Sequence, residues 1–555
     1  MNRILGLIFL LFLVGACAQS DTPPAAAVAT AHPTATEAGH RIMAAGGNAF
    51  DAAVAVSATL AVVEPYSSGI GGGGFWLLHR ADDGQQLMID GRETAPLAAH
   101  RDMYLDEQGK VVDGLSIDGP LAAGIPGVPA ALVHLSERYG KLTLKQSLAP
   151  AIEAAREGFV VTEHYRRMTG FRLEALRRSA DAAAIFLHEN EVPPLGHIIK
   201  QSDLARTLEA MAEHGRAGFY QGPVAKALVE GVRAEDGIWQ LEDLDQYKVV
   251  EREPITGRYH DFKLISASPP SSGGIALAEM LNILEGNELD KLDSVTRKHL
   301  IVEAMRRAYR DRAEYLGDTD FVDVPVAKLT DKAYARQLTD TILRDEATPS
   351  ASLKPVAVED EGPHTTHFSI LDKAGNRVSA TLSINYPFGA CFVPPGTGVL
   401  LNDEMDDFSS KPGVPNAYGL VGAEANAIAP GKRPLSSMSP TFVEGPDGVA
   451  ILGTPGGSRI ITMVLLGLLD YTEGGEPESW VSVGRYHHQY LPDAIQHEPG
   501  ALSEEEKTQL QLMGHQLKEI SYRYGNMQAI LWDKKGKRVL AASDPRVEGK
   551  AEVRE

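Results

Sequence analysis

The chain has 555 residues, 43% of them hydrophobic and 23% charged, which is the composition of an ordinary core-forming protein. Its length allows either several domains or one large α/β unit. The formal net charge of −21 argues against a nucleic-acid partner, because phosphate binding depends on clustered Lys and Arg side chains.

The first residues have the pattern of an export signal. Arg3 is followed by an apolar run over residues 4–14, which is too short to span a bilayer comfortably. The run ends in Leu-Val-Gly-Ala-Cys, which resembles a bacterial lipoprotein signal with Cys17 as the lipidated first residue of the mature protein. The alternative is an ordinary secretory signal that is cut near Ala16 or Ala18.

The signal interpretation implies a location and a domain order. Residues 1–17 are the predicted signal peptide, and residues 18–36, rich in Ala, Thr and Pro, are a predicted flexible tether. We expect an exported protein, periplasmic or at the cell surface, with a lipid anchor on a bacterial membrane. The other cysteine, Cys391, is predicted to be a buried, inert thiol, and no intramolecular disulfide is expected.

The part of the chain before residue 345 is predicted to be largely helical. Residues 38–45 and 51–63 form the first two predicted helices, and a glycine run at 69–74 leads into a short strand. The glycine run lacks the Lys-Ser/Thr of a phosphate loop, so a tight backbone passage near the active site is the better interpretation. Further helical patterns lie at 132–139, 148–157, 204–214 and 295–316.

A hairpin follows an acidic stretch just past two thirds of the chain. Residues 366–370 alternate between two faces, residues 372–376 are a turn, and a second strand runs to residue 384. A hairpin symmetric about Ala374 places Thr365 opposite Ser383, with Cβ atoms about 5 Å apart. The sequence therefore predicts that two hydroxyl groups meet at the open end of the hairpin.

A threonine that begins a strand has a special use if the bond before it is cut. It then carries a nucleophilic hydroxyl and a free α-amine with a pKa near ~8, which can accept the hydroxyl proton. On these residues alone, however, a Thr-rich strand start is the ordinary interpretation.

The last part of the chain contains three further candidate regions. The Pro- and Gly-rich loop at 411–419 is a predicted lid, and its Tyr418 is a candidate substrate contact. A second predicted hairpin at 440–452 delivers residues 455–458 to a helix start that suits an anion. The acidic turn at 402–407 is either solvated or calcium-binding, although the ligand spacing fits calcium poorly.

Adjacent histidines, His487 and His488, point to opposite faces of a strand and have no second ligand cluster in the sequence. They are predicted to be structural, and we expect no metal or other cofactor.

Six stretches in this order resemble the γ-glutamyltransferase (γ-glutamyltranspeptidase) family of N-terminal-nucleophile hydrolases. They cover nearly all of the chain after residue 30 and are Gly46-Gly47-Asn48-Ala49, Gly71-Gly72-Gly73-Gly74-Phe75, Thr365-Thr366-His367, Met405-Asp406-Asp407-Phe408, Lys432-Arg433-Pro434-Leu435-Ser436-Ser437-Met438-Ser439-Pro440 and Pro455-Gly456-Gly457-Ser458-Arg459.

The resemblance implies an α/β fold, an αββα sandwich built from both fragments of a self-cleaved precursor. Cleavage between His364 and Thr365 would give a large subunit, residues 37–364, and a small subunit, residues 365–555, which stay together as a heterodimer. The implied reaction is γ-glutamyl transfer or hydrolysis on glutathione and related amides, with water, an amino acid or a dipeptide as acceptor.

The resemblance also assigns roles to residues. Thr365 is the implied nucleophile, Ser383 the hydroxyl beside it, and Gly456 and Gly457 the oxyanion donors. The remaining residues would bind the donor head group, and they are Arg92, Ser436 and Ser437 for the carboxylate, and Asp407, Glu404 and Asn385 for the ammonium.

Two alternatives stay open. One is an acylase for glutaryl or cephalosporin side chains on the same fold, although a glutaryl donor has no ammonium for Glu404 and Asp407 to bind. The other is an inactive lipoprotein that serves as a binding module, which the retention of the implied catalytic residues argues against. The chain departs from the family at Ser383, generally a threonine, and at residues 386–387 and 390–395; the last departure bears on acceptor choice and not on the core chemistry.

Overall fold

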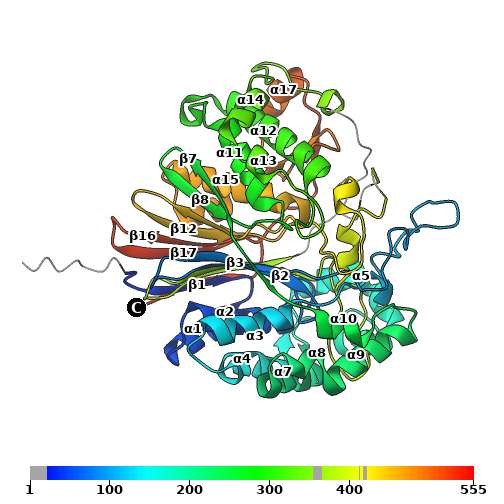
Figure 1. The fold of residues 1–555 in the computed structure, drawn as a ribbon. Helices are drawn as coiled ribbons and strands as arrows, with labels where there is room; N and C mark the ends of the chain where they lie inside the picture. Colours follow the sequence, from blue (N-terminus) through cyan, green and yellow to red (C-terminus); the bar gives the residue numbers. More distant parts are fainter. Residues whose placement is uncertain (1–21, 354–364, 412, 415, 417–419, 421) are drawn as a thin grey trace, which may run out of the picture.

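Two β-sheets lie face to face in the middle of the computed structural model, and helices cover both outer faces (Figure 1). The structure describes residues 22–353, 365–411, 413, 414, 416, 420 and 422–555. The αββα sandwich expected from the family resemblance is therefore present.

The first sheet has seven strands in the order β18-β1-β9-β10-β2-β3-β6. Their bounds are β1 Ala26–Thr30, β2 Gly73–His79, β3 Gln86–Gly91, β6 Val250–Arg252, β9 Thr366–Leu371, β10 Arg377–Ser383 and β18 Lys550–Arg554.

The second sheet has six strands in the order β17-β16-β12-β11-β8-β7. Their bounds are β7 Ile255–Tyr259, β8 Phe262–Ser266, β11 Thr441–Glu444, β12 Gly448–Gly453, β16 Gln528–Asp533 and β17 Arg538–Ser543. Two small sheets complete the strands, namely β4 Phe159–Val160 with β5 Ile198–Ile199, and β13 Tyr486–His487, β14 Ile495–His497 and β15 Leu517–Glu519.

The helices between residues 33 and 246 gather on the outer side of the first sheet (Figure 1). They are α1 Pro33–Ala44, α2 Ala49–Val63, α3 Val128–Tyr139, α4 Leu144–Glu157, α5 Glu163–Arg178, α6 Ala180–Phe186, α7 Ser202–His214, α8 Ala217–Tyr220, α9 Gly222–Ala234 and α10 Leu241–Gln246.

The later helices cover the second sheet (Figure 1). They are α11 Gly273–Leu284, α12 Ser294–Tyr315, α13 Val326–Leu329, α14 Lys332–Thr339, α15 Ile460–Thr472, α16 Pro477–Ser482 and α17 Glu504–Leu512. Among the helices in the described part of the chain, none is long and apolar enough to cross a membrane.

The most buried helix on the first side is α2, which packs against β9 and β10. Every one of its residues is buried, which matches its Ala- and Val-rich sequence. The helix begins with a capping box in which Asn48 accepts from the N–H of Asp51 while the Asp51 carboxylate accepts from the N–H of Asn48. Its capped start and buried face give the hairpin a fixed surface to lie on.

The predicted hairpin register is confirmed. The β9–β10 ladder pairs Leu371 with Arg377 and ends with Thr366 opposite Leu382, so the next step places Thr365 opposite Ser383. On its other side β10 pairs with β2, with Ser383 opposite Gly73. A Cβ atom on Gly72 would lie 2.1 Å from the Ser383 carbonyl oxygen, which confirms the glycine run as a tight backbone passage.

The prediction of a tether over residues 18–36 is wrong for most of its length. Residues 26–30 form β1, which pairs with β9 and β18 inside the first sheet, and α1 begins at Pro33. All five residues of β1 are buried, because small Ala and Val side chains fit the crowded space on both faces of the sheet. Residues 18–21 and Cys17 lie outside the described residues.

Strands that precede and strands that follow residue 365 contribute to both sheets, and in the first sheet they interleave. In the first, β9 and β10 lie between β1 on one side and β2 on the other; in the second, β11 and β12 continue into β8 and β7. The predicted large and small subunits therefore share both sheets and the core between them.

Candidate active site

Thr365 lies at the start of β9 and its side chain belongs to the face of the first sheet that meets the second sheet. Along that face His367 packs against Gly453 of β12, and the Ser369 hydroxyl donates to the Gln528 carbonyl at 3.0 Å. Thr365 itself is only 6% exposed. It lines a pocket between the sheets together with Gly457, Ser458 and Ile460 from the start of α15.

The hydroxyl of Ser383 is oriented by its neighbours. Its Oγ accepts a hydrogen bond from the N–H of Asn385 at 2.8 Å, which leaves the hydroxyl proton to point elsewhere in the pocket. Asn385 has a positive φ of 71°, and its amide donates to the Asp403 carbonyl at 3.0 Å. The turn after β10 thus brings Ser383 and Asn385 to one pocket wall.

Arg92 is the charged centre of the site and is 1% exposed. Its Nη1 lies 2.8 Å from Glu404 Oε2, its Nη2 forms an ion pair with Asp407, and its Nε donates to the Pro434 carbonyl at 3.3 Å. The acidic turn that contains Glu404 and Asp407 is therefore folded around a buried arginine, and both the solvated and the calcium interpretations of that turn are wrong.

Several carboxyl groups share this small volume. Burial raises the pKa of Glu404 to about 8. Burial, and then the nearby Glu404 carboxyl, hold the pKa of Glu93 well above its usual range. Glu93 Oε2 lies 3.6 Å from Arg92 Nη1. The site therefore contains protonated carboxyl groups at neutral pH that a bound cation would encourage to ionise.

Hydrogen bonds hold Ser436 and Ser437 against the loop before α11. The N–H of Ser436 donates to the Pro270 carbonyl at 2.8 Å, and the N–H and the hydroxyl of Ser272 both donate to the Ser436 carbonyl. The N–H of Met438 donates to Ser436 Oγ at 3.1 Å. Ser437 Oγ accepts from a second guanidinium, that of Arg312, at 3.1 Å.

The two glycines after β12 have backbone conformations that suit glycine. Gly456 has φ 149° and Gly457 has φ 54°, and a Cβ atom on Gly456 would lie 2.3 Å from the Met463 side chain. The single 3₁₀ turn Gly457–Arg459 then leads into α15. N–H groups at such a helix entry are suited to holding an anion.

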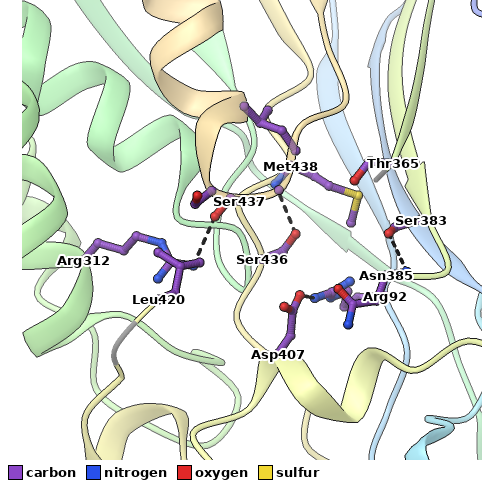
Figure 2. A pocket seen from close by; sticks show the side chains of 13 residues that line it. Arg92, Arg312, Thr365, Ser383, Asn385, Asp407, Leu420, Ser436, Ser437 and Met438 are labelled. Carbon is purple, nitrogen blue, oxygen red and sulfur yellow. Dashed lines mark hydrogen bonds and ion pairs between the residues drawn. The ribbon is translucent and has the colours of Figure 1, made fainter. Parts of the chain in front are cut away.

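One pocket, open to solvent, brings most of the predicted residues together (Figure 2). The predicted residues that line it are Arg92, Thr365, Ser383, Asn385, Asp407, Ser436, Ser437 and Gly457. Glu404 contacts Arg92, and Gly456 precedes Gly457 in the chain, but neither lines the pocket. Tyr418 lies outside the described residues, so its role and that of the lid remain predictions.

Sequence reasoning missed Arg312, Leu420, Met438, Ser458 and Ile460, which also line the pocket. Arg312 had a recognisable signal. It follows Met305, Ala308 and Tyr309 at helical spacing, on a stripe that is otherwise apolar and buried in α12. An arginine on such a stripe is unusual unless it has a partner in the interior.

The other residues singled out in the sequence lie outside the pocket. Cys391 is buried, as predicted, and burial raises the pKa of its thiol to about 12. His487 and His488 are also buried, with hydrogen bonds to Thr462 and Asp493.

One group in the described part of the chain has the spacing of metal ligands, namely His299, Glu303 and His515. These atoms already have protein partners. His299 and His515 hydrogen-bond to each other at 2.8 Å, and Glu303 forms ion pairs with Arg306 and Arg307. Two guanidinium groups beside the only carboxylate make this a poor cation site.

Known proteins resemble this chain in sequence and in fold. The family profile described as Gamma-glutamyltranspeptidase matches residues 35–553. The glutathione hydrolase proenzyme of Pseudomonas sp. (strain A14) is 46% identical over 493 residues, covering 88% of this chain and 85% of that protein. The corresponding proenzyme of Escherichia coli (strain K12) is 42% identical over 528 residues, covering 94% and 90%.

Among solved structures, the cephalosporin acylase from Bacillus halodurans superposes with a TM-score of 0.83 at 26% identity and covers 96% of each chain. The profile match spans nearly the whole sequence, and the relatives are similar over most of their own length. The chain therefore belongs to the gamma-glutamyltranspeptidase family.

Proposed function

We propose that this protein is a γ-glutamyltransferase and glutathione hydrolase that works through a γ-glutamyl ester on Thr365. The observation that carries the proposal is the arrangement of one pocket. The hydroxyl-bearing Thr365 and Ser383 line it together with Arg92, Asp407 and the two serines (Figure 2), and Glu404 contacts Arg92. That set matches an amide whose far end is an amino acid head group.

The enzyme first cuts its own chain between His364 and Thr365. The Thr365 hydroxyl attacks the carbonyl carbon of residue 364, and its oxygen takes over the acyl group from the Thr365 nitrogen as an ester. Water then opens the ester and leaves Thr365 with a free α-amine and hydroxyl. His364 lies outside the described residues, and support comes from the relatives, which are named proenzymes.

In the first half of the reaction, Thr365 Oγ attacks the γ-carbonyl carbon while its own amine takes the hydroxyl proton. The N–H groups of Gly456 and Gly457 would hold the negative oxygen of the tetrahedral intermediate, an effect of about 3 kcal/mol per donor in other acyl transferases. The C–N bond then breaks and the leaving amine takes the proton. Ser383, opposite Thr365 in the hairpin register, places a second hydroxyl beside the nucleophile.

In the second half, an acceptor attacks the ester carbon and frees Thr365. Water gives glutamate, and the amine of an amino acid or dipeptide gives a new γ-glutamyl amide. The same amine of Thr365 takes the proton from the acceptor and returns it to the Thr365 oxygen as the ester bond breaks.

The head group decides between this reaction and the acylase alternative. Arg92, Ser436 and Ser437 would bind its carboxylate, and Asp407, Glu404 and Asn385 its ammonium. A buried charge is costly unless it is paired, so a pocket with two acidic groups favours a donor that brings a cation. A glutaryl donor would bring no ammonium for Asp407 and Glu404 to bind.

We further propose that the enzyme is exported and anchored through a lipid on Cys17. This rests on the sequence of residues 3–17 alone. Two acyl chains or more would hold the protein firmly, where one would bind only marginally.

A panel of donors tests the function. Purified mature enzyme is assayed with glutathione, glutamine and matched γ-glutamyl and glutaryl anilides, with and without a dipeptide acceptor. We expect turnover of glutathione and the γ-glutamyl anilide and little of the glutaryl anilide. Equal turnover of the two anilides would replace this proposal with the acylase, and a single uncut band without activity would favour the binding protein.

A further inference from the structure

Arg312 is a buried cation whose hydrogen-bond partners, in the described part of the chain, are serine hydroxyls. It lies near the carboxyl end of α12 and is 5% exposed. Its Nε donates to Ser272 Oγ at 3.0 Å and its Nη2 to Ser437 Oγ at 3.1 Å. Within the described residues no carboxylate oxygen lies within 4.0 Å of its guanidinium, although most buried arginines of this protein have such a partner. Burial is the largest influence on its charge, and it lowers the pKa of Arg312.

Arg92, the other arginine of the pocket, is already ion-paired. The Asp407 carboxylate alone already balances the charge of Arg92 before any ligand arrives. A carboxylate that binds at Arg92 must therefore enter a cluster whose positive charge is already matched. The surplus positive charge of the pocket belongs to Arg312. A buried charge of this kind costs several kcal/mol unless an anion joins it.

The hydrogen bonds that Ser436 and Ser437 accept determine that their own hydroxyl groups act as donors. A guanidinium has only donors, so Ser437 Oγ must accept from Arg312, and its own O–H is left to donate. Ser436 is in the same state, because its Oγ accepts from the N–H of Met438. Two adjacent hydroxyls thus present protons to the pocket, which is the arrangement that a carboxylate requires.

We propose that Arg312 determines specificity for the α-carboxylate of the donor. It orients the Ser437 hydroxyl as a donor and supplies the positive charge that balances the carboxylate, a role that rests on the proposed function. Arg312 and Thr365 lie on opposite sides of the pocket, with Ser437 between them (Figure 2). Arg312 is therefore a positioning residue that acts through Ser437 and does not touch the reacting atoms.

The test compares two donors that differ only in the α-carboxylate. They are the γ-glutamyl anilide and the 4-aminobutyryl anilide, which keeps the amide and the ammonium. Arg312→Met should raise the KM for the γ-glutamyl anilide about 30-fold, with kcat changed much less, because the carboxylate loses its partner and the chemistry does not. The kcat/KM for the 4-aminobutyryl anilide should change less than about 3-fold.

Three further variants sharpen the comparison. Arg312→Lys keeps the charge and should restore part of the lost affinity. Ser437→Ala in the Arg312→Met background should add little, since the two act as one unit. Arg297→Met removes a surface arginine from the same helix, paired with Glu473, and should behave as wild type. If Arg312→Met fails to cut itself into two fragments, Arg312→Lys carries the test, with a smaller rise in KM confined to the γ-glutamyl anilide.

Other outcomes overturn the inference in distinguishable ways. An equal loss on both anilides would make Arg312 structural, and no loss on either would remove it from recognition. A loss with glutathione but not with the γ-glutamyl anilide would assign Arg312 to the carboxylate of the leaving peptide. If the wild type itself handles the 4-aminobutyryl and γ-glutamyl anilides equally well, it is the proposed head-group recognition that fails.

Discussion

Replacing Asp407 by alanine isolates the contribution of the donor ammonium. Its carboxylate is only 14% exposed, so an ammonium that it binds would be largely but not fully desolvated. Losing one partner of a desolvated pair costs about 2–5 kcal/mol. Because Glu404 remains 2.8 Å from Arg92, and because Asp407 touches solvent, the loss should fall near the lower end. About 2 kcal/mol corresponds to a roughly 30-fold fall in kcat/KM.

The assay measures kcat/KM for matched γ-glutamyl and glutaryl anilides in the wild type and in Asp407→Ala. The γ-glutamyl anilide should lose about 30-fold, whereas the glutaryl anilide, which has no ammonium, should change less than about 3-fold. Glu424→Ala serves as a control because it removes a carboxylate of the same segment that is exposed and paired with Arg101. Equal losses on both anilides would mean that Asp407 holds Arg92 in place and does not recognise the ammonium.

Three other predictions concern maturation, proton release and anchoring. Thr365→Ala should remain one uncut, inactive chain on a denaturing gel, and Ser383→Ala should slow both cutting and turnover; normal cutting of the former would exclude Thr365 as the nucleophile. Because Glu404 is protonated below about pH 8 and a bound ammonium favours its ionised form, binding of glutamate at pH 7 should release nearly one proton, less at pH 9, and none in Glu404→Gln. Calorimetry in two buffers of different ionisation enthalpy measures this release, and proton uptake at pH 7 would contradict the reasoning. Cys17→Ser should appear in the soluble fraction or remain unprocessed, and unchanged membrane fractionation would rule out the anchor.

Local patterns were sufficient to predict the central hairpin. The alternation in β9, the turn at 372–376 and the single symmetric register all lie within about twenty residues, so nothing distant had to be known. The helices α3, α4, α7 and α12 were likewise visible from their periodicity and differ from the predicted bounds by a few residues.

The charged part of the site could be predicted only through the family resemblance. Taken alone, the acidic run at 402–407 would be a solvated turn, and only its contact with Arg92, far away in the chain, makes burial possible. The same limit explains the two failures. Arg312 sits on a helix whose partner, Ser437, is likewise distant, and the alanines of β1 resemble a linker until the neighbouring strands are placed.

Because strands from both sides of residue 365 share the sheets, the proposed cut would change how the protein can refold. Neither fragment holds a complete sheet, so separating them requires opening both sheets and the core between them. Before the cut, unfolding is a unimolecular event that the same chain can reverse. After the cut, an unfolded molecule must find its other half at the ambient concentration, and refolding becomes a bimolecular reaction. After maturation the enzyme would therefore refold poorly once unfolded. The lifetime of the active form would then be set by the height of the unfolding barrier, which is kinetic stability.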